Sequence, residues 1–230
     1  MAELNFSTAP TPDPPQAAFD QHLPLSSTIQ QDFSRASYFS IDFYKKYFDV
    51  STEEITKKVK MAVNPTDKKF LTNQNQPELY GSIWSTITSL FVSMIFGNLS
   101  SMMSGKYWEG NISSMITASF FCFFYIIISP ILYKFLAKHD EFPSYIALVS
   151  LLGYSTLYFI PISFGRFLVG RKINILISIA GGAAMAYSIF VKLVAFYSDD
   201  TSKTKTMIAN LAIAGITFLV LVFIQYLAFK

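Results

Sequence analysis

The sequence predicts an all-α membrane protein with five transmembrane helices and a cytosolic, partly disordered N-terminal tail. Of its 230 residues, 52% are hydrophobic and only 14% are charged, whereas soluble proteins carry about 25% charged residues. Five apolar runs each reach the length of about 20 residues that a helix needs to cross the hydrocarbon layer. Charge also divides the chain, with a net charge of −2 in residues 1–82 and of +5 in residues 83–230.

Three regions follow from this division. Residues 1–37 are rich in proline and polar side chains, and because such a composition buries too little apolar surface to fold, we expect disorder there. Residues 38–82 form a cytosolic, amphipathic juxtamembrane segment, and residues 83–230 form the membrane domain. The overall charge of +3 is too small to suggest a nucleic-acid partner.

Two short amphipathic helices are expected within residues 38–63. In the first, the aromatic residues recur at helical spacing: Phe39, Phe43, Tyr47 and, beside them, Phe48. The second begins with a capping box at residues 51–54 and ends at Asn64-Pro65. These helices either cap the bundle or form a docking element for a protein or for lipid headgroups.

The membrane domain is expected to be a compact bundle of antiparallel neighbours, because the connectors between its apolar runs are short. The predicted spans are 83–103, 112–135, 145–168, 173–196 and 207–229. Lysines that precede the first span favour a cytosolic N-terminus, which places the C-terminus in the lumen after five crossings. The first 80 residues contain no apolar signal segment, so we expect the first span to serve as the targeting signal.

The composition of the span interiors argues against an enzyme or a transporter. No charged residue lies near the middle of any span, and Lys192 and Arg166 near span ends are expected to extend to the interface. With a single cysteine, Cys122, and no nucleophile or metal-ligand motif, we expect no enzyme, catalytic residue, cofactor or metal. The alternative is a small transporter or channel lined by Asn98, Ser93 and Ser89, or a lipid scramblase.

Small residues recur every fourth position along the first span and form one ridge. They are Ser85, Ser89, Ser93, Gly97 and Ser101. Such a ridge lets helix backbones approach closely in lipid, either inside this bundle or against a partner membrane protein. Pro130 and Pro161 are expected to kink the second and third spans.

Two stretches resemble the Ypt/Rab-interacting (YIP) domain family. One is Pro77-Glu78-Leu79-Tyr80-Gly81-Ser82-Ile83-Trp84 before the first span, and the other is Gly153-Tyr154-Ser155 in the third. They are similar to the family's Asp-Leu-Tyr-Gly-Pro-like stretch and its membrane Gly-Tyr motif, with Glu78 in place of Asp and Ser82 in place of Pro. Residues 44–50 and 96–100 look like the branch found at the Golgi and late endosomes.

The resemblance implies a non-enzymatic factor for vesicle-mediated transport in endoplasmic reticulum, Golgi or endosomal membranes. Its implied partners, besides the lipid bilayer, are Rab-type GTPases and another YIP-family member in a hetero-oligomer. In this interpretation Glu78 points to the cytosol as a docking charge, Gly81 permits a bend after Leu79, and Tyr80 and Trp84 anchor at the interface. Alternatively, these residues only orient the first helix.

Overall fold

The computed structural model describes residues 45, 47–72, 77–103, 112–137, 143–169, 173–196 and 203–228. All of them lie in the compact unit Lys45–Lys230. The expected disordered tail, Phe39 and Phe43 fall outside the described residues. Every regular element in the described ranges is helical, and the elements are α3 (Thr52–Val63), α4 (Lys69–Thr72), α5 (Tyr80–Met103), α6 (Ile112–Ala137), α7 (Tyr145–Ser155), η1 (Thr156–Tyr158), α8 (Phe159–Val169), α9 (Asn174–Phe196) and α10 (Lys203–Ala228).

The prediction of an all-α protein with five transmembrane helices is confirmed. In the described part of the chain, five helical segments are long and apolar enough to cross a membrane: α5, α6, α7 to α8 taken together, α9 and α10. The third span is interrupted by the 3-10 turn η1 just before Pro161. Because proline has no N–H, it cannot donate to the carbonyl of Leu157, and the helix tightens at that point.

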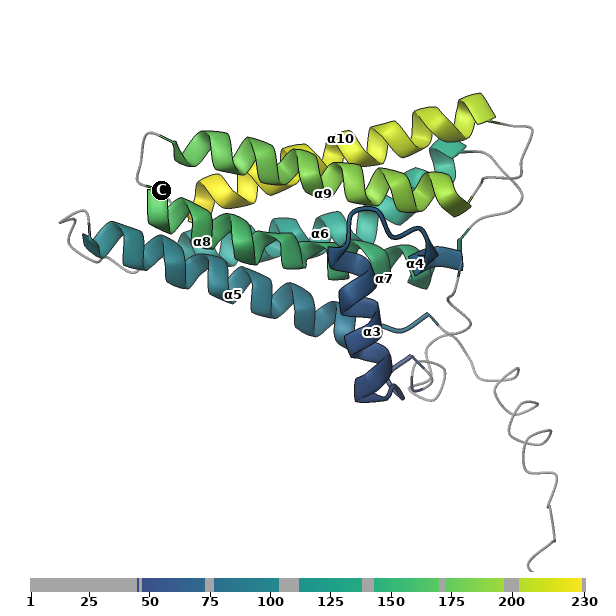
Figure 1. Cartoon of the computed structure of the whole chain (residues 1–230), viewed down its shortest axis with the longest axis horizontal. Coiled ribbons are helices and arrows are strands. Elements are labelled where there is room, and N and C mark those ends of the chain that lie inside the picture. The colour runs from purple at the N-terminus through teal and green to yellow at the C-terminus, as the bar shows by residue number, and fades with distance from the viewer. Residues whose placement is uncertain are drawn as a thin grey trace, which may run out of the picture. The chain divides into compact units, whose positions relative to one another are not determined.

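The five spans pack as a bundle of two closely associated groups. Helix α10 lies between α9 and α6, and α5 packs against α7 and α8 (Figure 1). Two buried polar pairs join α6 to α10: the Tyr133 hydroxyl donates to Asn210 Oδ1 at 2.6 Å, and the Tyr125 and Thr217 hydroxyls bond to each other. Large apolar side chains are exposed along the outside of the spans, as expected for surfaces that face lipid.

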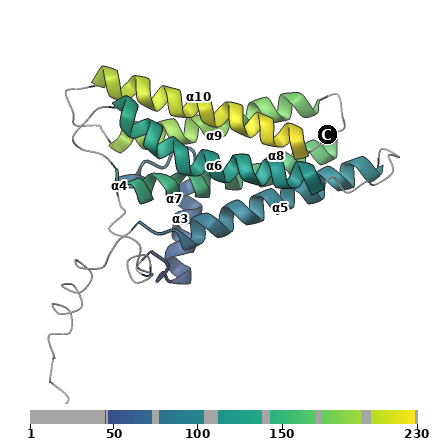
Figure 2. The same ribbon diagram turned by 180° about the vertical axis from the view of Figure 1, so that it is seen from behind.

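Helix α3 begins and ends where the sequence predicts. The Ser51 side chain accepts a hydrogen bond from the Glu54 N–H at 3.3 Å, and Asn64 caps the C-terminus after Val63. Helix α3 runs steeply across the direction of the spans (Figures 1 and 2). It packs on α7, and the short α4 packs on α9, at the end of the bundle where α9 ends and α7 begins. The described residues of the juxtamembrane segment are therefore part of the folded unit.

Candidate functional site

The two stretches that carry the family resemblance contact each other. A Cβ atom on Gly81, in the first turn of α5, would lie 1.9 Å from the Tyr154 hydroxyl oxygen of α7. A Cβ atom on Gly153 would lie 1.9 Å from Ser82 Oγ. Each glycine therefore makes room for a side chain of the other stretch, and both are needed for the close approach of α5 and α7. We call the contact formed by Glu78, Gly81, Ser82, Gly153 and Tyr154 the junction.

Hydroxyl groups tie the two helices of the junction together. Ser82 Oγ donates to the Val149 carbonyl at 3.3 Å, and Thr86 Oγ1 lies 2.9 Å from the Ser82 carbonyl and 3.4 Å from the Gly153 carbonyl. Ser82 stands where the family pattern has proline. A proline has no hydroxyl, so this chain gains an interhelical hydrogen bond at the position where it departs from the pattern.

Glu78 is buried inside the protein, with only 2% of its surface exposed. Its Oε2 accepts a hydrogen bond from the Gly81 N–H at 2.9 Å, and its Oε1 lies 3.7 Å from Lys58 Nζ of α3. The expectation that Glu78 points outward as a docking charge is wrong, because the N-terminus of α5 and the Lys58 ammonium both attract a negative charge inward.

Lys58 connects α3 to the junction. Burial lowers the pKa of its ammonium below the ordinary value, while the negative charges of Glu78 and Glu54 act in the opposite direction. The lowered pKa shows that loss of hydration has the larger effect. The ion pair therefore determines where α3 lies on the bundle but contributes little net electrostatic stabilisation.

The remaining residues of the predicted partner-binding set lie near the junction with different exposures. The Leu79 N–H donates to the Tyr47 carbonyl at 2.9 Å, and both side chains are half-buried. Phe48 is 45% exposed, and Tyr80 and Trp84 are also exposed, with their ring centroids 6.3 Å apart. Near the junction, Phe48, Tyr80 and Trp84 are thus open to an external partner or to lipid.

Lys192 was expected to extend to the membrane interface, and the structure shows that this is wrong. Its side chain is completely buried, and its ammonium donates to the Ala62 carbonyl at 3.0 Å, to the Asn64 carbonyl at 3.1 Å and to the Ser188 hydroxyl. These carbonyls belong to the C-terminus of α3, which carries partial negative charge. Lys192 of α9 therefore fastens α3 to the bundle.

Arg166 is likewise buried, contrary to the same expectation. Its Nη1 donates to the Gln225 carbonyl at 2.6 Å, in the last turn of α10. The Gln225 side chain in turn donates to Ser163 Oγ at 3.1 Å, and Ser163 donates to Ser93 Oγ at 2.8 Å. Gln225 is not among the residues singled out from the sequence, although a polar residue inside an apolar span is itself a signal that it has an internal partner.

The ridge of small residues on α5 faces the inside of the bundle. Ser85, Ser89, Ser93 and Gly97 are buried and Ser101 is half-buried, on a helix that packs against α7 and α8. The structure thus uses the ridge for packing within this chain. Among the described residues, no group of three or more His, Cys, Asp or Glu side chains could hold a metal ion.

These features define an integral membrane protein of five spans whose juxtamembrane helix is fastened to the bundle by buried polar contacts. The chain is similar to the protein named YIPF1 homolog from Dictyostelium discoideum, with 23% identity over 151 residues. The match covers 63% of this chain and 43% of the relative, so it spans less than half of the relative's length. This similarity supports a relationship of the chain to the YIP family. No family model and no solved structure matches the chain.

Proposed function

We propose that this protein is a non-enzymatic membrane-trafficking factor of the endoplasmic reticulum, Golgi and endosome system. In this proposal its N-terminus is cytosolic, and it binds Rab-type GTPases, another YIP-family member, or both, in support of vesicle transport. The similarity to the YIPF1 homolog and the five apolar helices support the proposal. The lysines before the first span support the orientation.

The attachment of α3 to the bundle is the observation that carries the proposal. Three polar contacts hold this helix. Lys58 pairs with Glu78, and the Tyr158 hydroxyl donates to the Val63 carbonyl at 2.8 Å. The Lys192 ammonium donates to the Ala62 and Asn64 carbonyls. A helix fixed in this way, together with the hydrogen bond from the Leu79 N–H to the Tyr47 carbonyl, sets the position of Tyr47 and Phe48, which shortly precede it. Such preorganisation lowers the entropy lost when a partner docks.

Aromatic side chains that precede α3 in the sequence are the partner-contact groups in this proposal. Phe39, Phe43 and Phe48 supply anchors of the kind that fill pockets in protein interfaces. Tyr47, Leu79, Glu78 and Gly81 act indirectly in this proposal, because the hydrogen bonds from the Leu79 N–H to the Tyr47 carbonyl and from the Gly81 N–H to Glu78 hold the backbone next to Phe48.

The test is co-purification of Rab-type GTPases and YIP-family proteins with the full chain from solubilised membranes. The triple variant Phe39→Ala, Phe43→Ala, Phe48→Ala should lose at least about tenfold of the bound partner, since each anchor in an interface can contribute more than about 1 kcal/mol. Its membrane insertion and melting temperature should match those of the unchanged protein, because Phe48 makes little contact with the core.

Phe135→Ala is the matched control. Phe135 is also an exposed phenylalanine and lies in the last turn of α6, at the same end of the bundle as α3. Partner recovery should not change in this variant. Full recovery of every partner by the triple variant would contradict docking through the aromatic anchors.

A further inference from the structure

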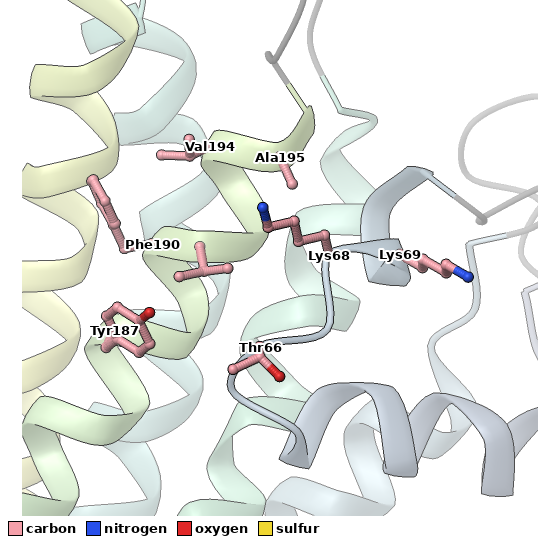
Figure 3. Close-up of a pocket in the computed structure, with 8 residues that line it drawn as sticks. Thr66, Lys68, Lys69, Tyr187, Phe190, Val194 and Ala195 are labelled. Carbon is pink, nitrogen blue, oxygen red and sulfur yellow. The ribbon is translucent and has the colours of Figure 1, made fainter.

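A groove of about 600 Å³ lies between the loop that joins α3 to α4 and the outer face of α9 (Figure 3). One wall is apolar and is formed by Phe190, Val194 and Ala195, with Tyr187 further along the helix. The opposite wall contains Thr66 and two lysines, Lys68 and Lys69. The volume lies within the range of about 300–1,000 Å³ that is typical of small-ligand sites.

The two lysines differ in where their charges lie. The Lys68 ammonium extends over the groove toward α9, beside Ala195, whereas the Lys69 ammonium points away from α9 (Figure 3). Lys68 is exposed and forms no ion pair with a carboxylate of the described residues. It therefore offers three N–H donors and one positive charge to an occupant of the groove.

Neighbouring polar groups are already engaged elsewhere. Asp67, the acidic residue next to Lys68, accepts a hydrogen bond from the Lys69 N–H at 2.8 Å and interacts electrostatically with buried Lys192. The Thr66 hydroxyl donates to Asn64 Oδ1 at 2.9 Å. Lys68 is thus the group on this wall that is available to bind an anion.

The loop that carries Lys68 is fixed against α9 from both sides. Lys192 binds the Asn64 carbonyl before the loop, and Phe70 and Leu71 are buried after it. The groove is consequently a formed feature of the folded unit rather than a contact between independent segments.

The apolar residues and the Lys68 ammonium that line the groove lie at different positions along the axis of α9. From Tyr187 to Ala195 the helix rises by about 12 Å, at 1.5 Å per residue, and α9 ends one residue later at Phe196. Lys68 lies at this end of the helix and the apolar wall extends away from it. A phospholipid has the same arrangement, with its phosphate at the surface of the bilayer and its acyl chains below.

We propose that this groove binds one anionic phospholipid of the bilayer, with the phosphate-bearing headgroup on Lys68 and an acyl chain along Phe190 and Val194. Charge complementarity at Lys68 selects an anionic lipid over a zwitterionic one, and the apolar wall selects a lipid over a soluble phosphate. The site can be tested separately from the proposed binding of a GTPase, because none of the residues that line it belongs to the proposed partner-contact groups.

The experiment is native mass spectrometry of the detergent-solubilised full chain, titrated with phosphatidylinositol 4-phosphate, phosphatidylserine or phosphatidylcholine of identical acyl chains. One molecule of an anionic lipid should be retained in preference to phosphatidylcholine. Lys68→Ala should weaken that binding about fivefold, the effect of losing one cation near an anionic headgroup. Lys69→Ala is the matched control and should leave the binding unchanged.

A second variant tests the apolar wall. Ala195→Phe fills the groove beside the Lys68 ammonium and should reduce binding of the anionic lipids while Lys68 remains. A photo-crosslinking amino acid at position 194 should become joined to phospholipid in native membranes.

Four results would overturn the proposal. They are equal retention of phosphatidylcholine, equal loss in the Lys68→Ala and Lys69→Ala variants, competition by soluble inositol bisphosphate at the same concentration as the lipid, and a polypeptide rather than a lipid crosslinked at position 194. The first two would indicate non-specific attraction, the third a soluble phosphate ligand, and the fourth a protein occupant.

Discussion

Two buried cations in this protein perform the same chemistry for different elements. Lys192 and Arg166 are both buried in spans, and each donates hydrogen bonds to carbonyls at the C-terminus of another helix. Lys192 binds the end of α3, which is not among the candidate spans, whereas Arg166 binds the last turn of α10, which is one. One cation therefore attaches the juxtamembrane segment, and the other holds two spans together.

The two contacts differ in which helix would detach from the bundle if the contact were lost. Helix α10 is an apolar span that packs extensively on α9 and α6, so it stays in place without Arg166. Helix α3 is short, and Ala62 is the only one of its residues that is buried. Because isolated helices of about 12 residues are marginal in water, α3 depends on its polar attachments to remain folded and docked.

The largest effect is expected for Lys192→Met. This variant keeps most of the side-chain volume but removes the charge-assisted hydrogen bonds to Ala62 and Asn64, at a cost of about 3 kcal/mol to the docking of α3. Hydrogen exchange in lipid nanodiscs should show loss of protection in α3, while α10 remains protected.

Arg166→Met is the matched variant for this comparison. It should increase exchange in the last turn of α10 and leave α3 unchanged. If both variants lowered protection throughout the bundle to a similar extent, the two cations would not have separate tasks, and the comparison would fail.

A smaller effect of about 2 kcal/mol is expected for Gly153→Ala, because the new methyl group overlaps Ser82 in a closely packed contact. Thermal unfolding in detergent measures this loss. The double variant Gly153→Ala, Ser82→Gly should recover part of it, since the atom nearest to the new methyl is Ser82 Oγ, whereas the Ser82 carbonyl oxygen at 3.0 Å remains. Failure of the second change to restore stability would show that α5 and α7 are not limited by this contact.

The fold was largely predictable because its signals are local. Runs of apolar residues defined the five spans to within a few residues, and a capping serine and Asn64 defined the ends of α3. The inward direction of Glu78 was not predictable, because it depends on Lys58, which is 20 positions away in sequence but only 3.7 Å away in space.

The burial of Lys192 and Arg166 was not predictable for a similar reason. A charged residue near the end of a span ordinarily extends to water. The residue pattern along α9 alone does not show that the C-terminus of α3 contacts Lys192. The contact of Gly81 with Tyr154 also could not be predicted from the sequence, although both residues belong to the stretches that carry the family resemblance. Sequence patterns indicated which positions matter, and only the packing showed which of them meet.

A modest effect is expected for Glu78→Gln. The amide oxygen can still accept the hydrogen bond from the Gly81 N–H, so only the charge that faces Lys58 is lost. We expect the docking of α3 to weaken by about 1 kcal/mol, well below the effect of Lys192→Met. Hydrogen exchange of α3 measures both variants on one scale, and a larger effect of Glu78→Gln would make Glu78, not Lys192, the main attachment.

The smallest effect is a change in the ionisation of Lys58. Burial already lowers the pKa of Lys58 below 10.5, and Glu78 partly opposes the shift, so Glu78→Gln should lower this pKa further. Competitive acylation of lysines across pH 7–10.5 reports the neutral fraction, with the exposed Lys57 as the internal reference. Because the folded state favours the neutral amine, Lys58 should contribute more to stability as the pH rises through its folded-state pKa toward 10.5. An acylation profile of Lys58 that does not respond to Glu78→Gln would show that the two charges are not coupled in the membrane-embedded protein, and α3 would then be attached by Lys192 and Tyr158 alone.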